Sequence, residues 1–80
     1  MRVPRDLAGP DLIRRLARLG YTVSRQTGSH VRLTSQQNGE HHLTVPNHDP
    51  LRVGTLSAIL AAVAAHQRIS RDELLERLFD

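Results

Sequence analysis

The sequence predicts an α+β fold: a three-stranded antiparallel sheet with helices on one face and a short additional helix at the C-terminal end. Apolar residues recur at helical spacing near the N-terminus and again in the second half of the chain. Between them, three short segments alternate apolar and polar residues, as strands do when one face of a sheet is buried. The connections between these segments are only a few residues long, which favours antiparallel neighbours.

The first helix is expected over residues 10–19. Gly9 can serve as its N-cap, Pro10 suits the first helical position, and Gly20 suits the left-handed C-terminal stop. Its apolar stripe consists of Leu12, Ile13, Leu16 and Leu19. The arginines that lie off this stripe, and that are expected to face solvent or a partner, are Arg14, Arg15 and Arg18.

Three strands are expected over residues 21–25, 30–34 and 42–45. Thr27-Gly28-Ser29 is expected to form a tight turn between the first two strands, and residues 35–39 a hairpin loop between the second and third. The helices cover the apolar face, so the alternation leaves a set of polar side chains on the open face. This set comprises Thr22, Ser24, His30, Arg32, Thr34, His42 and Thr44.

The second helix is expected to start near Thr55, which can cap it, and to run to about residue 65. A third helix is expected to start at Ser70, because Ser70-Arg71-Asp72-Glu73 has the pattern of a capping box. No repeat and no long linker divides the chain. We therefore expect one domain over residues 1–80, with a core of about 4–65 and the extra helix at about 70–79.

Composition points to an anionic partner. The chain has 80 residues, a formal net charge of +3 and no cysteine, which excludes disulfides, thiolate zinc sites and cysteine nucleophiles. All 11 basic residues are arginine, whose planar guanidinium binds phosphate through two donors. This favours nucleic acid, although a GC-rich genome would also produce an arginine-only chain. Because Tyr21 and Phe79 are the only aromatic residues, a platform that stacks several bases is not expected.

The cellular location is expected to be the cytoplasm. The N-terminal segment lacks the apolar core of a signal peptide. The longest apolar run, residues 58–65, is far shorter than a membrane span. We therefore expect no membrane partner.

His30 is the sharpest candidate for catalysis. It follows Gly28 and Ser29 at the entrance of the second strand, on the polar face and near Arg25 and Arg32. Histidine can take a proton from one oxygen and give one to another, which RNA cleavage without a metal requires. The arginines could neutralise charge in the transition state, and the turn could offer backbone N–H groups to a phosphate. An ordinary surface histidine is the alternative that these residues leave open.

A metal site is the other chemistry that the histidines suggest. His41, His42 and His48 are candidate ligands, but His41 and His42 are neighbours in a strand and point to opposite faces. Separate strand and loop histidines are therefore the preferred interpretation, with no metal and no cofactor expected. The chain has no P-loop, no Rossmann glycine pattern and no HExxH motif.

Four segments, in this order, resemble a known family. They are Gly9-Pro10-Asp11-Leu12-Ile13-Arg14-Arg15-Leu16 with Leu19-Gly20-Tyr21, Arg25-Gln26-Thr27-Gly28-Ser29-His30, Thr44-Val45-Pro46-Asn47-His48, and Gly54-Thr55-Leu56 with Ile59-Leu60. Their order and spacing resemble the HicA family, also called YcfA-like, which is the toxin half of HicA–HicB toxin–antitoxin modules. The resemblance covers about residues 4–65.

This resemblance implies a double-stranded-RNA-binding-domain-like fold, which agrees with the order of elements read above. It implies a metal-independent endoribonuclease, an mRNA interferase, whose catalytic histidine corresponds to His30. It also implies a HicB-like antitoxin that covers the active site. On this hypothesis Arg25 and Arg32 contact phosphate, Gly28 and Ser29 form the turn that presents His30, and the substrate is single-stranded mRNA.

Two questions stay open at the level of sequence. Acid–base cleavage needs a second proton-transfer group, and Ser29, His42 or water could supply it. The alternative functions are a non-catalytic RNA-binding module and a decayed toxin that is kept for its interaction with a partner.

Overall fold

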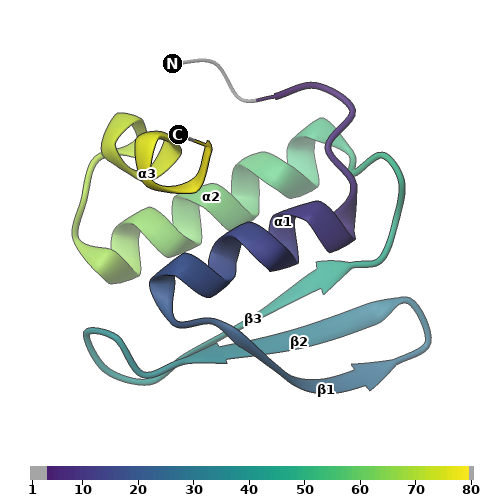
Figure 1. Cartoon of the computed structure of the whole chain (residues 1–80), viewed down its shortest axis with the longest axis horizontal. Helices are drawn as coiled ribbons and strands as arrows, with labels where there is room; N and C mark the ends of the chain where they lie inside the picture. Colours follow the sequence, from purple (N-terminus) through teal and green to yellow (C-terminus); the bar gives the residue numbers. More distant parts are fainter. Residues whose placement is uncertain (1–3, 80) are drawn as a thin grey trace.

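The structure, a computed structural model, describes residues 4–79 (Figure 1). Its elements in chain order are α1 (Gly9–Leu16), the 3₁₀ turn η1 (Ala17–Leu19), β1 (Thr22–Thr27), β2 (His30–Ser35), β3 (His41–Pro46), α2 (Val53–Gln67) and α3 (Arg71–Phe79). The predicted order of helix, three strands and helices is therefore confirmed. Within the described residues, no helix is long and apolar enough to cross a bilayer.

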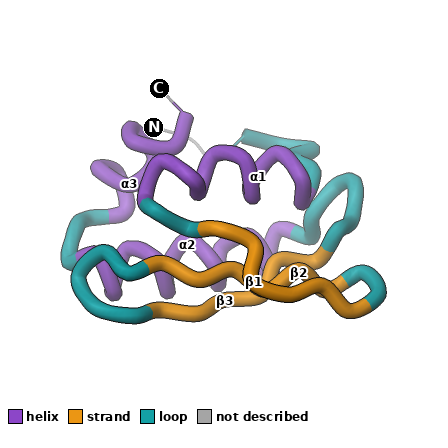
Figure 2. Tube along the Cα trace, turned by 60° about the horizontal axis from the view of Figure 1, so that its bottom comes forward, coloured by secondary structure: helices purple, strands orange, loops and turns teal. Residues whose placement is uncertain are grey.

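The three strands form one antiparallel sheet in the order β1-β2-β3. The central strand β2 shows the predicted alternation, because Val31 and Leu33 are buried whereas His30 and Arg32 are exposed. Figures 1 and 2 show the helices on one side of the sheet only. The α+β class, the single covered face and the double-stranded-RNA-binding-domain-like order α-β-β-β-α are confirmed.

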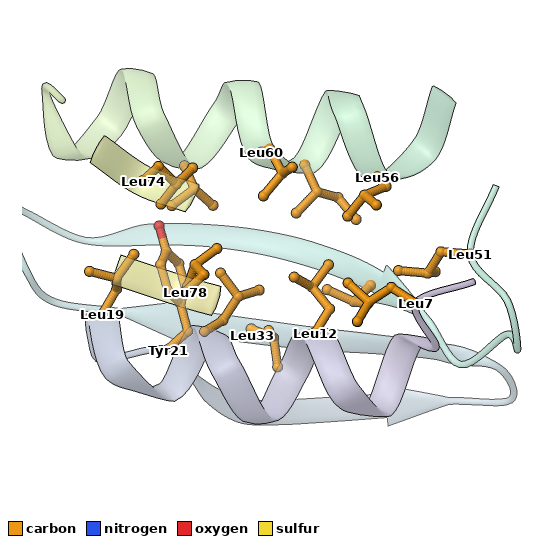
Figure 3. Close-up of a cluster of buried hydrophobic side chains, with 14 of the residues drawn as sticks. Leu7, Leu12, Leu19, Tyr21, Leu33, Leu51, Leu56, Leu60, Leu74 and Leu78 are labelled. Atoms are coloured by element: carbon orange, nitrogen blue, oxygen red, sulfur yellow. The ribbon is translucent and has the colours of Figure 1, made fainter. Parts of the chain in front are cut away.

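The core lies between the sheet and the helices and is built mainly from leucines (Figure 3). Leu12 and Leu16 of α1, Leu33 of β2 and Leu60 of α2 are fully buried. Tyr21, just before β1, is also buried, with its ring between the sheet and the helices. Leu12, Leu16 and Leu19 of the apolar stripe predicted for the first helix are therefore part of this core, which is stabilised chiefly by the removal of apolar surface from water.

Gly9 has a different role from the one predicted. The N-cap of α1 is Ala8, and Gly9 is the first helical residue. A Cβ atom at Gly9 would overlap the carbonyl oxygen of Pro46 at the end of β3, so glycine lets the start of α1 touch that strand. Gly20 ends η1 in the left-handed conformation, with φ 81°, as predicted.

The start of α2 was wrongly predicted, whereas the cap of α3 is confirmed. Helix α2 begins at Val53, and its N-cap Arg52 makes no side-chain capping bond, so Thr55 lies inside the first turn. At α3, the Ser70 hydroxyl oxygen accepts a 3.1 Å hydrogen bond from the backbone N–H of Glu73. Tertiary packing of its apolar face stabilises α2 without a polar cap.

Of the three arginines of the first helical segment, Arg14 and Arg18 are exposed as predicted, whereas Arg15 is half-buried. Arg15 donates a 2.9 Å hydrogen bond to the carbonyl of Leu78, and Arg18 donates to the carbonyls of Arg77 and Leu78, each at 3.1 Å. The last carbonyls of a helix have no intrahelical partners, so cations bind them well. Arg15 and Arg18 therefore fasten α3 to the first helical segment, while Arg14 is exposed and pairs with Asp11.

Candidate active site on the open face of the sheet

The β1–β2 turn presents His30 as predicted. Gly28 and Ser29 form a two-residue loop between the paired residues Thr27 and His30. Gly28 has φ +58° and open space around its missing side chain, so the backbone conformation, not crowding, calls for glycine here. His30 therefore begins β2 directly after the turn, with its side chain exposed.

A β-bulge in β1 brings Arg25 to the same face as His30. Val23 pairs with Leu33, but the next pair along is Arg25 with Arg32, so Ser24 is an extra residue. Simple alternation would have turned Arg25 toward the helices. The bulge reverses the alternation, and Arg25 lies across from Arg32 on the open face. No glycine or proline marks the position, so nothing in the sequence indicated it.

A shallow hollow of about 200 Å³ on the open face collects these side chains. It is lined by Arg25, Thr27, His30, Arg32 and Thr44. The structure thus brings together three of the five predicted site residues. The other two, Gly28 and Ser29, form the adjoining turn. Thr27 was missed because its place on this face depends on the bulge.

The segment after β3 fixes the position of the hairpin. The backbone N–H of Asn47 donates a 2.6 Å hydrogen bond to the carbonyl of Ser29, and the N–H of Gly9 donates a 2.8 Å bond to the carbonyl of His48. The turn that carries His30 is therefore tied through this segment to the start of α1. A side chain held on such a turn has less freedom to move away from its neighbours.

His42 lies on the open face but outside the hollow. It pairs with Thr34, which lies four residues from His30 along β2. At the usual strand rise, the Cα atoms of Thr34 and His30 are about 13 Å apart. His42 and His30 are therefore too far apart to act on the same phosphodiester bond. Ser29 also lies outside the set of residues that line the hollow.

His41 and His66 belong to a separate cluster at the opposite end of the sheet from the β1–β2 turn. The Tyr21 hydroxyl is 2.6 Å from His41 Nδ1, and the rings of His41 and His66 stack at 4.3 Å. His66 Nε2 donates to the carbonyls of Gln37 and Gly39 at 2.9 and 3.0 Å. Burial lowers the pKa of His41, and the neighbouring His66 and His42 lower it further.

The opposite orientations of His41 and His42 agree with the prediction, because His41 contacts Tyr21 and His66 whereas His42 contacts Thr34 on the open face. Among residues 4–79, no three histidine, aspartate or glutamate side chains come together in a group that could hold a metal ion.

Comparison with known proteins gives one family. Residues 9–64, more than half of the chain, match the family model described as the HicA toxin of bacterial toxin–antitoxin systems. The match includes the hollow, the β1–β2 turn and most of α2, and it ends before α3. No curated protein and no solved structure gives a significant match to the chain.

Proposed function

Because the chain belongs to the HicA toxin family of bacterial toxin–antitoxin systems, we propose that it is an endoribonuclease that cuts mRNA, with His30 as its catalytic residue. The observation that carries this proposal is the hollow in which His30 lies with Arg25 and Arg32 on an uncovered face of the sheet. Cleavage of a phosphodiester needs a group that transfers protons and cations that stabilise the negative charge of the transition state. His30 can supply the first, and the two arginines can supply the second.

The nucleophile in this reaction is the 2′-hydroxyl group of the substrate itself. The ribose 2′-oxygen attacks the adjacent phosphorus while the bond to the 5′-oxygen breaks, which leaves a 2′,3′-cyclic phosphate and a free 5′-hydroxyl. One proton leaves the 2′-hydroxyl and one reaches the 5′-oxygen, so the step balances without a co-reactant. His30 carries out at least one of these transfers, and Arg25 and Arg32 stabilise the extra negative charge on phosphorus.

Water is the second proton carrier in this proposal. The side chains that line the hollow beside His30 are the hydroxyls of Thr27 and Thr44 and two guanidinium groups, which exchange protons poorly near neutral pH. His42 is about 13 Å away along the sheet. The hollow is shallow and open, so water reaches the bond that breaks.

The partner that inhibits the toxin is, in this proposal, a HicB-like antitoxin that covers the open face. A toxin of this family works together with an antitoxin, and among residues 4–79 no element covers the open face that carries the proposed catalytic residue. Arg25 and Arg32 on this face offer ion pairs to acidic side chains of such a partner. A neighbouring reading frame that encodes a HicB-like protein would support this assignment.

The experiment that tests the proposal compares the purified chain with His30→Ala on single-stranded mRNA in the presence of EDTA. We expect the wild type to cut and the variant to lose at least a hundredfold in rate, as is usual when an acid–base group is removed. His48→Ala serves as the matched control, because His48 is an exposed histidine of the loop after β3. Equal thermal unfolding of the three proteins shows that the loss is chemical.

Other outcomes favour the alternatives. If the wild type binds RNA in a salt-dependent way but leaves it intact, the chain is a non-catalytic RNA-binding module. If it neither binds nor cuts RNA but binds a HicB-like protein, it is a decayed toxin. Full cleavage by His30→Ala would show that His30 is not the catalytic residue.

A further inference from the structure

A row of hydrogen-bonded polar side chains crosses the open face beyond the hollow. The Ser24 hydroxyl donates to the carbonyl of Arg32 at 3.3 Å, and the Thr34 hydroxyl donates to Ser24 Oγ at 3.1 Å. Thr34 Oγ1 lies 2.8 Å from Nδ1 of His42, whose Nε2 lies 3.1 Å from a carboxylate oxygen of Glu40. Four side chains from all three strands and the β2–β3 loop are therefore linked in one chain.

The contacts of His42 show how its ring meets an anion. Thr34 Oγ1 lies within hydrogen-bonding distance of both Ser24 Oγ and Nδ1 of His42, so it holds the ring in place. Hydrogen bonds from Gln36 and His42 lower the pKa of Glu40, so its carboxylate is ionised and can only accept. Nε2 of His42 therefore carries the proton of this contact and donates it to the carboxylate.

The Glu40 carboxylate that contacts His42 is easily displaced. The Glu40 and His42 side chains are 62% and 39% exposed, and an ion pair this exposed is weak. Glu40 lies at the end of the β2–β3 loop, where its side chain can turn into solvent. A phosphate would offer Nε2 the same kind of acceptor with more charge.

We propose that His42, held in place by Thr34 and Ser24, is a second phosphate-binding subsite for RNA, and that the Glu40 carboxylate occupies it until RNA arrives. This proposal rests on the proposed function. The subsite lies about 13 Å from His30, so it binds the backbone of a neighbouring nucleotide and not the scissile phosphate. Arg32 lies between His30 and Thr34 on β2, and its charge acts on the Glu40 carboxyl group. RNA would then run across the sheet, roughly along β2.

Binding of an uncleavable 2′-O-methyl oligoribonucleotide tests the subsite without any chemistry. His42→Ala should weaken binding about three- to tenfold, and the slope of log Kd against log salt should fall by about 0.7, the amount for one phosphate contact on a single strand. His42→Arg, which places a permanent cation at this position, should restore both. Glu40→Gln should tighten binding, whereas the matched change Glu76→Gln on α3 should not.

Cleavage kinetics separate this proposal from the proposed function. On a dinucleotide, which has only the scissile phosphate, His42→Ala should match the wild type, whereas on a longer RNA it should raise KM and leave kcat unchanged. If His42→Ala lowers kcat on the dinucleotide, His42 belongs to the catalytic machinery and the subsite assignment is wrong. The assignment is also wrong if RNA binding is unchanged and only antitoxin binding falls. If the wild type cuts no RNA but His42→Ala still weakens binding, the proposed function fails and the subsite stands.

Discussion

His41 occupies the contact between the β2–β3 loop and the end of α2. Its ring accepts or donates a hydrogen bond at Tyr21 and stacks on His66, whose own Nε2 is bound to two loop carbonyls. Burial and the charges of His66 and His42 lower the pKa of His41 below the ordinary value of 6.5. Protonation of the His41 ring is therefore less favourable in the folded state than in the unfolded chain.

This arrangement predicts that stability falls when the pH drops below about 6.5. Between that value and the lower pKa of folded His41, the unfolded chain binds a proton that the folded chain does not, so the free energy of unfolding rises with pH. Above this window the ring is neutral in both states and adds no slope. Urea unfolding across this range should show the slope in wild type and less of it in His41→Gln.

His48→Ala is the control, because it removes an exposed histidine and should keep the slope. Equal slopes in all three proteins would contradict the assignment to His41. The separate loss of stability through Glu40, whose pKa is lowered, begins only as the pH falls below about 4.5, whereas the loss through His41 begins at about 6.5.

At the scale of elements, the bulge in β1 decides which side chains face the hollow. Without Ser24, Arg25 would still pair with Arg32, because the strand would simply become regular. Without Gln26, the strand would also become regular, but Ser24 would pair with Arg32 and Arg25 would turn toward the helices. The two single-residue deletions therefore remove the same irregularity with opposite consequences for Arg25.

We expect the deletion of Ser24 to keep RNA cleavage within a few-fold of wild type on a dinucleotide. The deletion of Gln26 should reduce it about tenfold or more, because a cation leaves the reacting phosphate. Cleavage rates of the two variants, with circular dichroism to show that both retain the sheet, give the comparison. If the Ser24 deletion loses more activity than the Gln26 deletion, the bulge does not position Arg25 as described.

The whole molecule shows where sequence patterns suffice and where they do not. Apolar residues that recur with a period of two or of 3.6 residues predicted the order of the elements and the covered face of the sheet. They could do so because burial of one face produces these periods in strands and helices. The bulge at Ser24 and the close approach of Gly9 to Pro46 depend on contacts between distant segments. The turn that presents His30 depends only on neighbouring residues and was predicted. The position of Arg25 on the open face depends on the bulge and was not predicted.

Helix α3 is integral to the core although the family match ends before it. Leu74, Leu75 and Leu78 are at most 1% exposed, and the Leu78 carbonyl receives hydrogen bonds from Arg15 and Arg18. Figure 1 shows α3 on the side of α1 and α2 that is remote from the sheet. Its contribution therefore reaches the hollow only through the stability of the whole fold.

Leu78→Ala should consequently lower stability and spare the chemistry. Truncation of a buried leucine costs about 2–5 kcal/mol. In a domain of this size that corresponds to a fall of about 10 °C or more in Tm. Glu76→Ala, on the exposed side of the same helix, should leave Tm nearly unchanged. Well below the midpoint, where the Leu78 variant is still folded, it should cut RNA at the wild-type rate.

An unchanged Tm would place α3 outside the core. A loss of rate in the folded variant would mean that α3 acts on the open face directly, and the separation of stabilising helix from reactive sheet would then be wrong.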